Sequence, residues 1–134
     1  MPELDEGARI DVGEYRRLRE TVGWSAPAAS DAALQAALDG TWNVTAREDG
    51  ELVGLGRLLD DGALYATIWD MIVVPGEQRR GIGRAILERL LARASARTIV
   101  ALVATPAGRP LYEEYGFTVE SSGSVGMLLR PSPS

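Results

Sequence analysis

The stretch VVPGEQRRGIGRAILERLLA, residues 73–92, decides the fold because a strand ends and a helix begins within it. Pro75 interrupts a run of β-branched residues, and Gly81 and Gly83 follow among arginines. The first amides of a helix have no partner inside the helix, and with the helix dipole they favour an anion such as a pyrophosphate. Glycines lack the Cβ atoms that would hold this anion away. The glycine pair alone favours a plainer interpretation, a tight turn beside a solvated helix face.

Hydrophobic spacing predicts the elements on both sides of this stretch. Residues 82–95 repeat apolar side chains at helical spacing, and residues 63–74 form a run typical of a central strand. The pair Asp49 and Gly50 favours a tight hairpin turn. The other expected elements are a short strand at 8–12, helices at 13–23 and 30–40, hairpin strands at 41–49 and 51–59, a buried strand at 98–105, a short helix at 109–116 and a last strand at 125–130.

The order of these elements predicts a mixed α/β fold, with antiparallel hairpins first and one strand-helix-strand unit in the middle. The chain of 134 residues is 46% apolar and fits one domain over 1–134, with 130–134 as a flexible tail. No apolar run is long enough to span a bilayer, and the N-terminal residues are acidic. The sequence therefore predicts a cytoplasmic protein with no membrane partner.

The composition excludes several kinds of chemistry. The chain has no cysteine, histidine or lysine, since all 14 basic residues are arginine. Thiol nucleophiles, histidine triads, Schiff-base lysines and nearly every zinc site are excluded, and no motif suggests a metal. The net charge of -5 argues against a nucleic-acid partner. Residues 77–97 nevertheless carry a local charge of +4, so the quoted stretch is a basic segment of an acidic protein.

A dinucleotide-binding fingerprint is one alternative explanation of the glycine pair. Ile86 stands where the third glycine of that fingerprint is expected. The residues about 20 positions further on are apolar, where the fingerprint expects a ribose-binding acid. This alternative ranks below the one that two motifs support.

Two motifs resemble those of the GNAT superfamily of N-acyltransferases. QRRGIG, residues 78–83, is similar to the acyl-CoA-binding motif of this family, and LYEEYGF, residues 111–117, resembles its second signature. The resemblance covers residues 8–130. It implies a mostly antiparallel, twisted central sheet of six to seven strands, with helices on both faces and a splay at the central parallel pair. It also implies acyl transfer from acetyl-CoA to a primary amine, by direct attack in a ternary complex and without a metal.

The resemblance assigns cofactor-binding residues and an acid. Met71, Ile72 and Val73 would lie along the pantetheine arm of acetyl-CoA. The pyrophosphate would bind the loop and first helical turn, which consist of Gln78, Arg79, Arg80, Gly81, Ile82, Gly83 and Arg84. Thr105 replaces an asparagine that contacts the cofactor in many members. Tyr112 matches the tyrosine that protonates the departing thiolate, whereas Tyr115 matches a packing residue.

The general base departs from the pattern of the family. Thr67 and Trp69 stand where different members carry a glutamate. Asp70 is the nearest carboxylate and a candidate base, but strand alternation points it away from the face of residues 67 and 69 unless a bulge intervenes. A structural, hydrogen-bonded Asp70 is equally consistent with the sequence. The amine could instead bind neutral, or lose its proton through water to Glu51, Asp60, Asp61 or Glu120.

The acceptor is the least defined part of the prediction. Trp24 and Trp69 are candidates to line its pocket. The negative charge outside the basic segment favours a small cationic amine, and a homodimer is compatible with the resemblance. The missing glutamates support an alternative function, a catalytically silent acyl-CoA sensor or binding module on the same fold.

Overall fold

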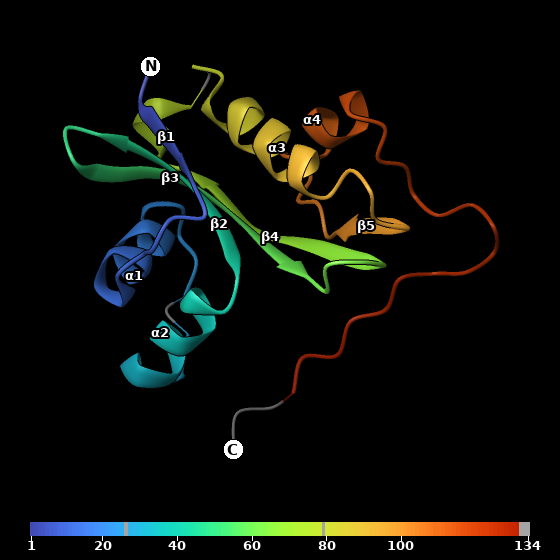
Figure 1. Ribbon diagram of the computed structural model, residues 1–134, viewed down its shortest axis with the longest axis horizontal. Helices are drawn as coiled ribbons and strands as arrows, with labels where there is room; N and C mark the ends of the chain where they lie inside the picture. The colour runs from blue at the N-terminus through green and yellow to red at the C-terminus, as the bar shows by residue number, and fades with distance from the viewer. Residues whose placement is uncertain (26, 79, 132–134) are drawn as a thin grey trace. The chain divides into compact units, whose positions relative to one another are not determined.

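The computed structural model describes residues 1–25, 27–78 and 80–131. The chain divides into two compact units, Met1–Val103 and Ala104–Ser134. The first unit holds a sheet with its covering helices, and the second holds one short helix (Figure 1).

The first unit is built on one five-stranded sheet in the sequential order β1-β2-β3-β4-β5. Its strands are β1 (Glu3–Glu6), β2 (Trp42–Glu48), β3 (Glu51–Asp60), β4 (Tyr65–Val73) and β5 (Ile99–Leu102). The first four pair antiparallel, whereas β4 and β5 pair parallel. Asp49 and Gly50 have φ angles of 51° and 80°, the conformation that suits a tight hairpin turn between β2 and β3. The predicted hairpin and mixed α/β fold are confirmed.

Two helices, α1 (Val12–Thr21) and α2 (Asp31–Asp39), cover one face of the sheet (Figure 1). Asp11 caps α1 in a capping box, and the Ser30 hydroxyl accepts an amide hydrogen bond at the start of α2. Between the helices and the sheet lies an apolar cluster of Ile10, Tyr15, Leu18, Leu34, Leu38, Leu55 and Ile72. Removal of these side chains from water holds both helices against the sheet.

The helix α3 (Ile82–Arg93) covers the opposite face and packs directly on β3 (Figure 1). A Cβ atom at Gly56 of β3 would lie 2.7 Å from side-chain atoms of Ile86 and Leu90. A Cβ atom at Gly54, two residues earlier on the same face of β3, would lie 3.0 Å from side-chain atoms of Ile82 and Ile86. Glycine at these two positions therefore allows α3 to approach the sheet closely. Since α3 connects β4 to β5, the predicted strand-helix-strand unit is confirmed.

The second unit contains the helix α4 (Arg109–Glu114). Gly116 follows with a φ of 92°, a left-handed conformation that ends the helix. The Phe117 amide then donates to the Tyr112 carbonyl at 3.2 Å. The rings of these two residues meet edge to face, with centroids 5.9 Å apart. The chain after α4 is thus turned back onto the helix.

Two predicted strands are wrong. The N-terminal strand lies at Glu3–Glu6 rather than 8–12, because Asp11 caps α1. The strand predicted at 125–130 is absent from the described structure, and its apolar side chains are exposed. A short apolar run does not form a strand unless its backbone finds a pairing partner. The sheet of the described residues therefore has five strands rather than six to seven.

The strand β5 also differs from the buried strand predicted at 98–105. It is shorter, and the side chains of Ile99 and Val103 are 54% and 56% exposed. Within the described sheet, β5 pairs only with β4 and forms the edge. An apolar run in a parallel sheet is buried where helices cover both faces of the sheet, and the exposed Ile99 and Val103 side chains are not covered in this way.

Candidate active site

The strand β5 pairs with only the first part of β4 (Figure 1). β5 pairs only with residues 65–68 of β4, although β4 continues to Val73. On its other edge β4 stays paired with β3 to its end. The backbone groups of residues 69–73 on the β5 side thus have no strand partner in the described part of the chain, and a ligand can use them. Met71 and Ile72, like Val73, lie on this open edge.

A β-bulge lies within the open part of β4. Asp70 and Met71 together oppose one residue of β3, Gly56. Asp70 has a φ of 53°, in the left-handed region that residues other than glycine rarely adopt. The bulge directs the Asp70 carboxylate toward α1, where it meets Tyr15, and the Met71 side chain toward α3. The bulge therefore breaks the strand alternation at Asp70, whose side chain the sequence alone could not assign to either face of the sheet.

The turn after β4 passes through a short 3-10 helix, η1 (Pro75–Glu77), into α3. The Gln78 side-chain amide donates to the Val73 carbonyl at 3.1 Å, which ties the turn to the end of β4. Gly81 is the N-cap of α3 with a φ of 79°, and it provides no side-chain cap. A Cβ atom there would meet no atom of the described residues within 4 Å, so among these residues the space beside Gly81 is open. The amides of residues 82–84 begin the helix beside this space.

The charged side chains of the turn bind one another. Arg80 Nη1 donates to the Glu48 carboxylate at 3.0 Å and also to Glu77. The hydrogen bond with Arg80 lowers the pKa of Glu48. Arg80 is thus held by two carboxylates of its own chain. Of the other residues predicted here, Ile82 is buried, Gly83 is half-buried, Arg84 is exposed, and Arg79 lies outside the described residues.

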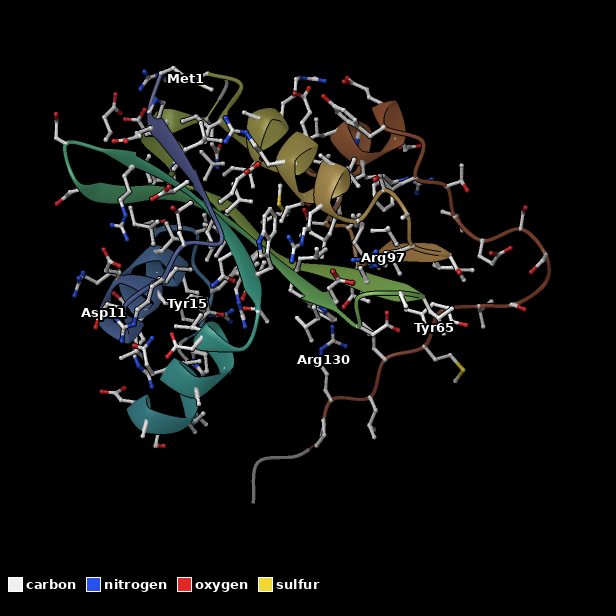
Figure 2. The ribbon with its side chains drawn as sticks, viewed as in Figure 1. Met1, Asp11, Tyr15, Tyr65, Arg97 and Arg130 are labelled. Carbon is white, nitrogen blue, oxygen red and sulfur yellow. The ribbon has the colours of Figure 1, made fainter. Side chains whose placement is uncertain are left out.

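The Asp70 carboxylate is the centre of a polar cluster between α1 and the sheet. It accepts hydrogen bonds from the Tyr15 hydroxyl at 2.6 Å, from Arg57 Nη1 at 2.8 Å and from Arg19 Nη1 at 3.2 Å. Of these donors, Tyr15 on α1 is labelled in Figure 2. We call these four residues the bulge cluster. Burial and the hydrogen bond to Asp70 raise the pKa of Tyr15. The Asp70 oxygens thus accept from three donors, as in the structural, hydrogen-bonded role that the sequence also allows, and the role of Asp70 as base stays a prediction.

Both candidate pocket tryptophans lie on the α1 and α2 side of the sheet. Trp69 pairs with Arg57 across strands, so it shares the face of the bulge cluster. It is 42% exposed, and its Nε1 donates to Thr67 Oγ1 at 2.9 Å. Trp24 is half-buried against the apolar cluster, and the Arg19 guanidinium lies 5.5 Å from its ring centroid. The structure therefore connects Trp24 to the bulge cluster through Arg19.

The acids named as alternative bases have other contacts or are fully exposed. Asp60 accepts from Arg97 Nε at 2.6 Å and Nη2 at 2.9 Å, and this pair lowers the pKa of Asp60 to about 2. Asp61 accepts from three backbone amides of the turn that follows it. Glu51 is exposed at the start of β3, and Glu120 in the second unit accepts from a nearby backbone amide. Asp60 and Asp61 thus act as structural acids.

The second unit carries the predicted acid. Tyr112 lies on α4 and is 9% exposed. Burial raises the pKa of its hydroxyl, so Tyr112 is protonated at neutral pH, as a tyrosine with an ordinary pKa also is. Tyr115, at the end of the same helix, is half-buried. The Thr105 hydroxyl accepts from the Gly108 amide at 3.1 Å, so it shapes the turn before α4.

Sequence reasoning missed three members of the bulge cluster. Arg57 had a usable signal, because an arginine inside the apolar strand GLGRLL must find a partner if it is buried. Tyr15 looked like an ordinary apolar-face residue of its helix. Nothing local links it to Asp70, which is 55 residues away in the chain.

The geometry defines what this region can bind. An open strand edge offers donors and acceptors to an extended amide-containing arm, and it leads directly to the open N-terminus of a helix, which suits an anion. Among the described residues, no group of histidine, cysteine, aspartate or glutamate side chains could hold a metal ion. In the same part of the chain, no helix is long and apolar enough to cross a membrane.

Comparison with known families agrees with this geometry. The family described as acetyltransferase (GNAT) domain matches residues 16–126. The chain belongs to the GNAT acetyltransferase family. The matched range of this GNAT protein includes the open edge of β4, the bulge and α3. The resemblance seen in QRRGIG and LYEEYGF is confirmed.

Curated relatives of the GNAT protein are named as acetyltransferases. The histone acetyltransferase TAP1 of Glycine max is 31% identical, over 96% of this chain and 61% of that protein. The chloroplastic GCN5-related N-acetyltransferase 2 of Arabidopsis thaliana is also 31% identical, over 96% of this chain and 58% of that protein. The chain thus spans about three fifths of the length of these relatives.

Solved structures share the fold. A GNAT family acetyltransferase of Streptococcus pneumoniae is 26% identical with a TM-score of 0.83, and the match covers 99% of this chain and 100% of that chain. An acetyltransferase of Clostridium acetobutylicum, solved with acetyl-CoA, is 20% identical with a TM-score of 0.68, and the match covers 96% of both chains. The second likeness shows the fold alone.

The predicted cytoplasmic location is contradicted by the relatives. Four of the plant relatives are named chloroplastic, which indicates a plastid for those proteins. The prediction relied on an acidic N-terminus and the lack of a long apolar run, and neither property distinguishes the cytoplasm from the interior of an organelle.

Proposed function

We propose that this GNAT protein transfers an acetyl group from acetyl-CoA to a primary amine. The observation that carries the proposal is the open edge of β4, which runs into the glycine-capped N-terminus of α3. Acetyl-CoA has an arm with two amide groups joined to a pyrophosphate, and these match the strand edge and the helix terminus in the same order. Its thioester supplies the acetyl group.

The residues present fit this ligand. The backbone of Met71, Ile72 and Val73 would hydrogen-bond to the arm, and the amides of residues 82–84 would bind the pyrophosphate. Gly81 leaves the approach to these amides open. Two carboxylates hold Arg80, whereas the backbone amides and the helix dipole attract the anion independently of this arginine.

Tyr112 is the proposed general acid. As the amine nitrogen forms its bond to the acetyl carbon, the carbon-sulfur bond breaks and the leaving thiolate needs a proton. A tyrosine hydroxyl is protonated at neutral pH and can donate this proton to a thiolate as it leaves. The position of Tyr112 within LYEEYGF supports the assignment.

The acceptor is proposed to be a small cationic amine that binds in a ternary complex beside Trp24 and Trp69. The negative charge of the chain outside residues 77–97 supports a cation. Thr67 and Trp69 hydrogen-bond to each other and offer no carboxylate. Since the oxygens of Asp70 are also occupied, we expect the amine to lose its proton to water or to bind in its neutral form.

Two measurements on the wild-type protein test the proposal. Calorimetry should show that CoA and acetyl-CoA bind with a Kd of about 1 μM to 1 mM. Incubation with acetyl-CoA and a panel of cationic amines should release free thiol only when a suitable amine is present. A wild type that binds no CoA, or that binds NAD more tightly, would contradict the proposal.

A silent acyl-CoA-binding module is the second candidate function. It is favoured by Thr67 and Trp69, which stand where a carboxylate is expected and which hydrogen-bond to each other. This candidate predicts CoA binding of the same strength but no amine-dependent thiol release. The two measurements above therefore separate the candidates.

A further inference from the structure

Asp70 adopts a strained backbone conformation inside a strand. Among the described residues, only Asp49 and Asp70 combine a side chain with a positive φ. Asp49 lies in the hairpin turn, where this conformation is expected. Asp70 lies in the middle of β4, so its conformation costs free energy and persists only because the surroundings impose it.

The surroundings that impose it are three hydrogen-bond donors on two elements. Tyr15 and Arg19 reach the Asp70 carboxylate from α1, and Arg57 reaches it from β3. Arg57 is itself fixed, because its Nη2 donates to the Ala37 carbonyl of α2. The Asp70 and Arg57 side chains are each 11% exposed, so solvent screens this contact little. The carboxylate is thus anchored to both helices and to the neighbouring strand.

The anchored residue determines how the rest of β4 is oriented. Beyond the bulge, Met71 faces α3 and Ile72 belongs to the apolar cluster under α1 and α2. If the same residues ran through as a regular strand without the bulge, every side chain and every backbone group after Asp70 would turn to the opposite side. The groups that face the open edge at residues 71–73 therefore depend on the bulge.

We propose that Asp70 is a positioning residue of the acyl-CoA site, whose anchored carboxylate holds the β4 bulge and so orients the backbone of residues 71–73 toward the acyl-CoA arm. The inference rests on the proposed function. It gives Asp70 a role in binding that requires no contact with the acceptor and no proton transfer.

The experiment compares variants that remove the anchor in different ways. Asp70→Gly tolerates the left-handed φ but removes the carboxylate, and Tyr15→Phe removes one donor while it keeps the ring in the core. Glu14→Gln is the matched control, because it weakens an ion pair that ties the same helix to Arg47 on β2, away from the bulge. Each variant is assayed for CoA affinity, for KM and kcat with acetyl-CoA, and for unfolding.

We expect Asp70→Gly to raise both the Kd for CoA and the KM for acetyl-CoA about tenfold, with a smaller change in kcat. Tyr15→Phe should shift the same two constants by about threefold. Asp70→Asn, which keeps one acceptor oxygen and tolerates the left-handed φ, should restore much of the affinity. Glu14→Gln should change unfolding alone.

Three results would overturn the inference. Wild-type CoA affinity in a folded Asp70→Gly protein would show that the carboxylate is only structural. Loss of kcat in both Asp70→Gly and Asp70→Asn, at constant CoA affinity, would make Asp70 the base. If Asp70→Gly does not fold, unchanged affinity in Tyr15→Phe decides against the inference. A wild type that fails to bind CoA is distinguishable from all three, because it removes the proposed function itself.

Discussion

Gly81→Val tests the proposed anion site at the start of α3 most directly. Gly81 has a φ of 79°, and a residue with a Cβ atom loses about 1–2 kcal/mol in this left-handed region. The added Cβ atom would meet no atom within 4 Å, so the loss is conformational and does not come from a clash in the core. We expect the free energy of unfolding to fall by about 1–2 kcal/mol while the fold is retained.

The same substitution should weaken CoA binding by a separate mechanism. The valine side chain would occupy the open space before the amides of residues 82–84, where the pyrophosphate is proposed to bind. We expect the Kd for CoA to rise at least tenfold, which is about 1.4 kcal/mol of binding free energy. Gly62→Val is the matched control, since Gly62 has a φ of 85°, equally open surroundings and no helix N-terminus beside it.

Calorimetric titration with CoA measures the affinity, and denaturant unfolding measures the stability of both variants. The reasoning predicts equal losses of stability in the two variants but a loss of affinity only in Gly81→Val. A folded Gly81→Val protein that binds CoA as tightly as the wild type would refute the anion site. Equal losses of affinity in both variants would attribute the effect to general destabilisation.

Three further predictions test the acid, an ion pair and the packing of α3. Tyr112→Phe should lower kcat at least tenfold with little change in acetyl-CoA affinity, because a proton donor acts only as the thiolate develops. Tyr115→Phe should lower kcat much less, and equal effects of the two variants in steady-state kinetics would reject Tyr112 as the acid. The pKa of Asp60 falls from 3.8 to about 2 in the folded protein, so its ion pair with Arg97 stabilises the fold fully above pH 3.8 and this contribution disappears as the pH falls toward 2. In Asp60→Asn the free energy of unfolding should lack this decrease between pH 3.8 and about 2. Acid unfolding measures it, and the same pH dependence in the variant and the wild type would contradict the prediction. Gly56→Ala places a Cβ atom 2.7 Å from side chains of α3 and should lower the free energy of unfolding by about 1–3 kcal/mol. In Gly76→Ala the new Cβ atom meets no atom of the described residues within 4 Å, so this control should not destabilise the protein; denaturant unfolding measures both variants.

Local interactions allowed the sequence to determine most elements and the cofactor segment. The hairpin turn follows from Asp49 and Gly50, which adopt positive φ, and α2 begins at the Ser30 cap. The strand, turn and helix of residues 73–92 are encoded in the same way, because proline, glycine and a helical apolar period act within a few residues. The two motifs therefore sufficed to identify the family and to single out Tyr112 before any contact was known.

Only the tertiary structure decided strand pairing and the orientation of Asp70. Residues 125–130 are mostly apolar, which predicts a strand, yet they find no partner among the described residues, because pairing depends on backbone groups elsewhere in the chain. The pairing of β4 with β5 stops at residue 68 of β4 and leaves the rest of this strand edge open, and this too depends on both segments. The orientation of Asp70 depends on a bulge opposite Gly56 and on donors up to 55 residues away. Residue spacing within one segment carries no information on register or on distant ion partners, so the sequence left Asp70 open between a base and a structural acid.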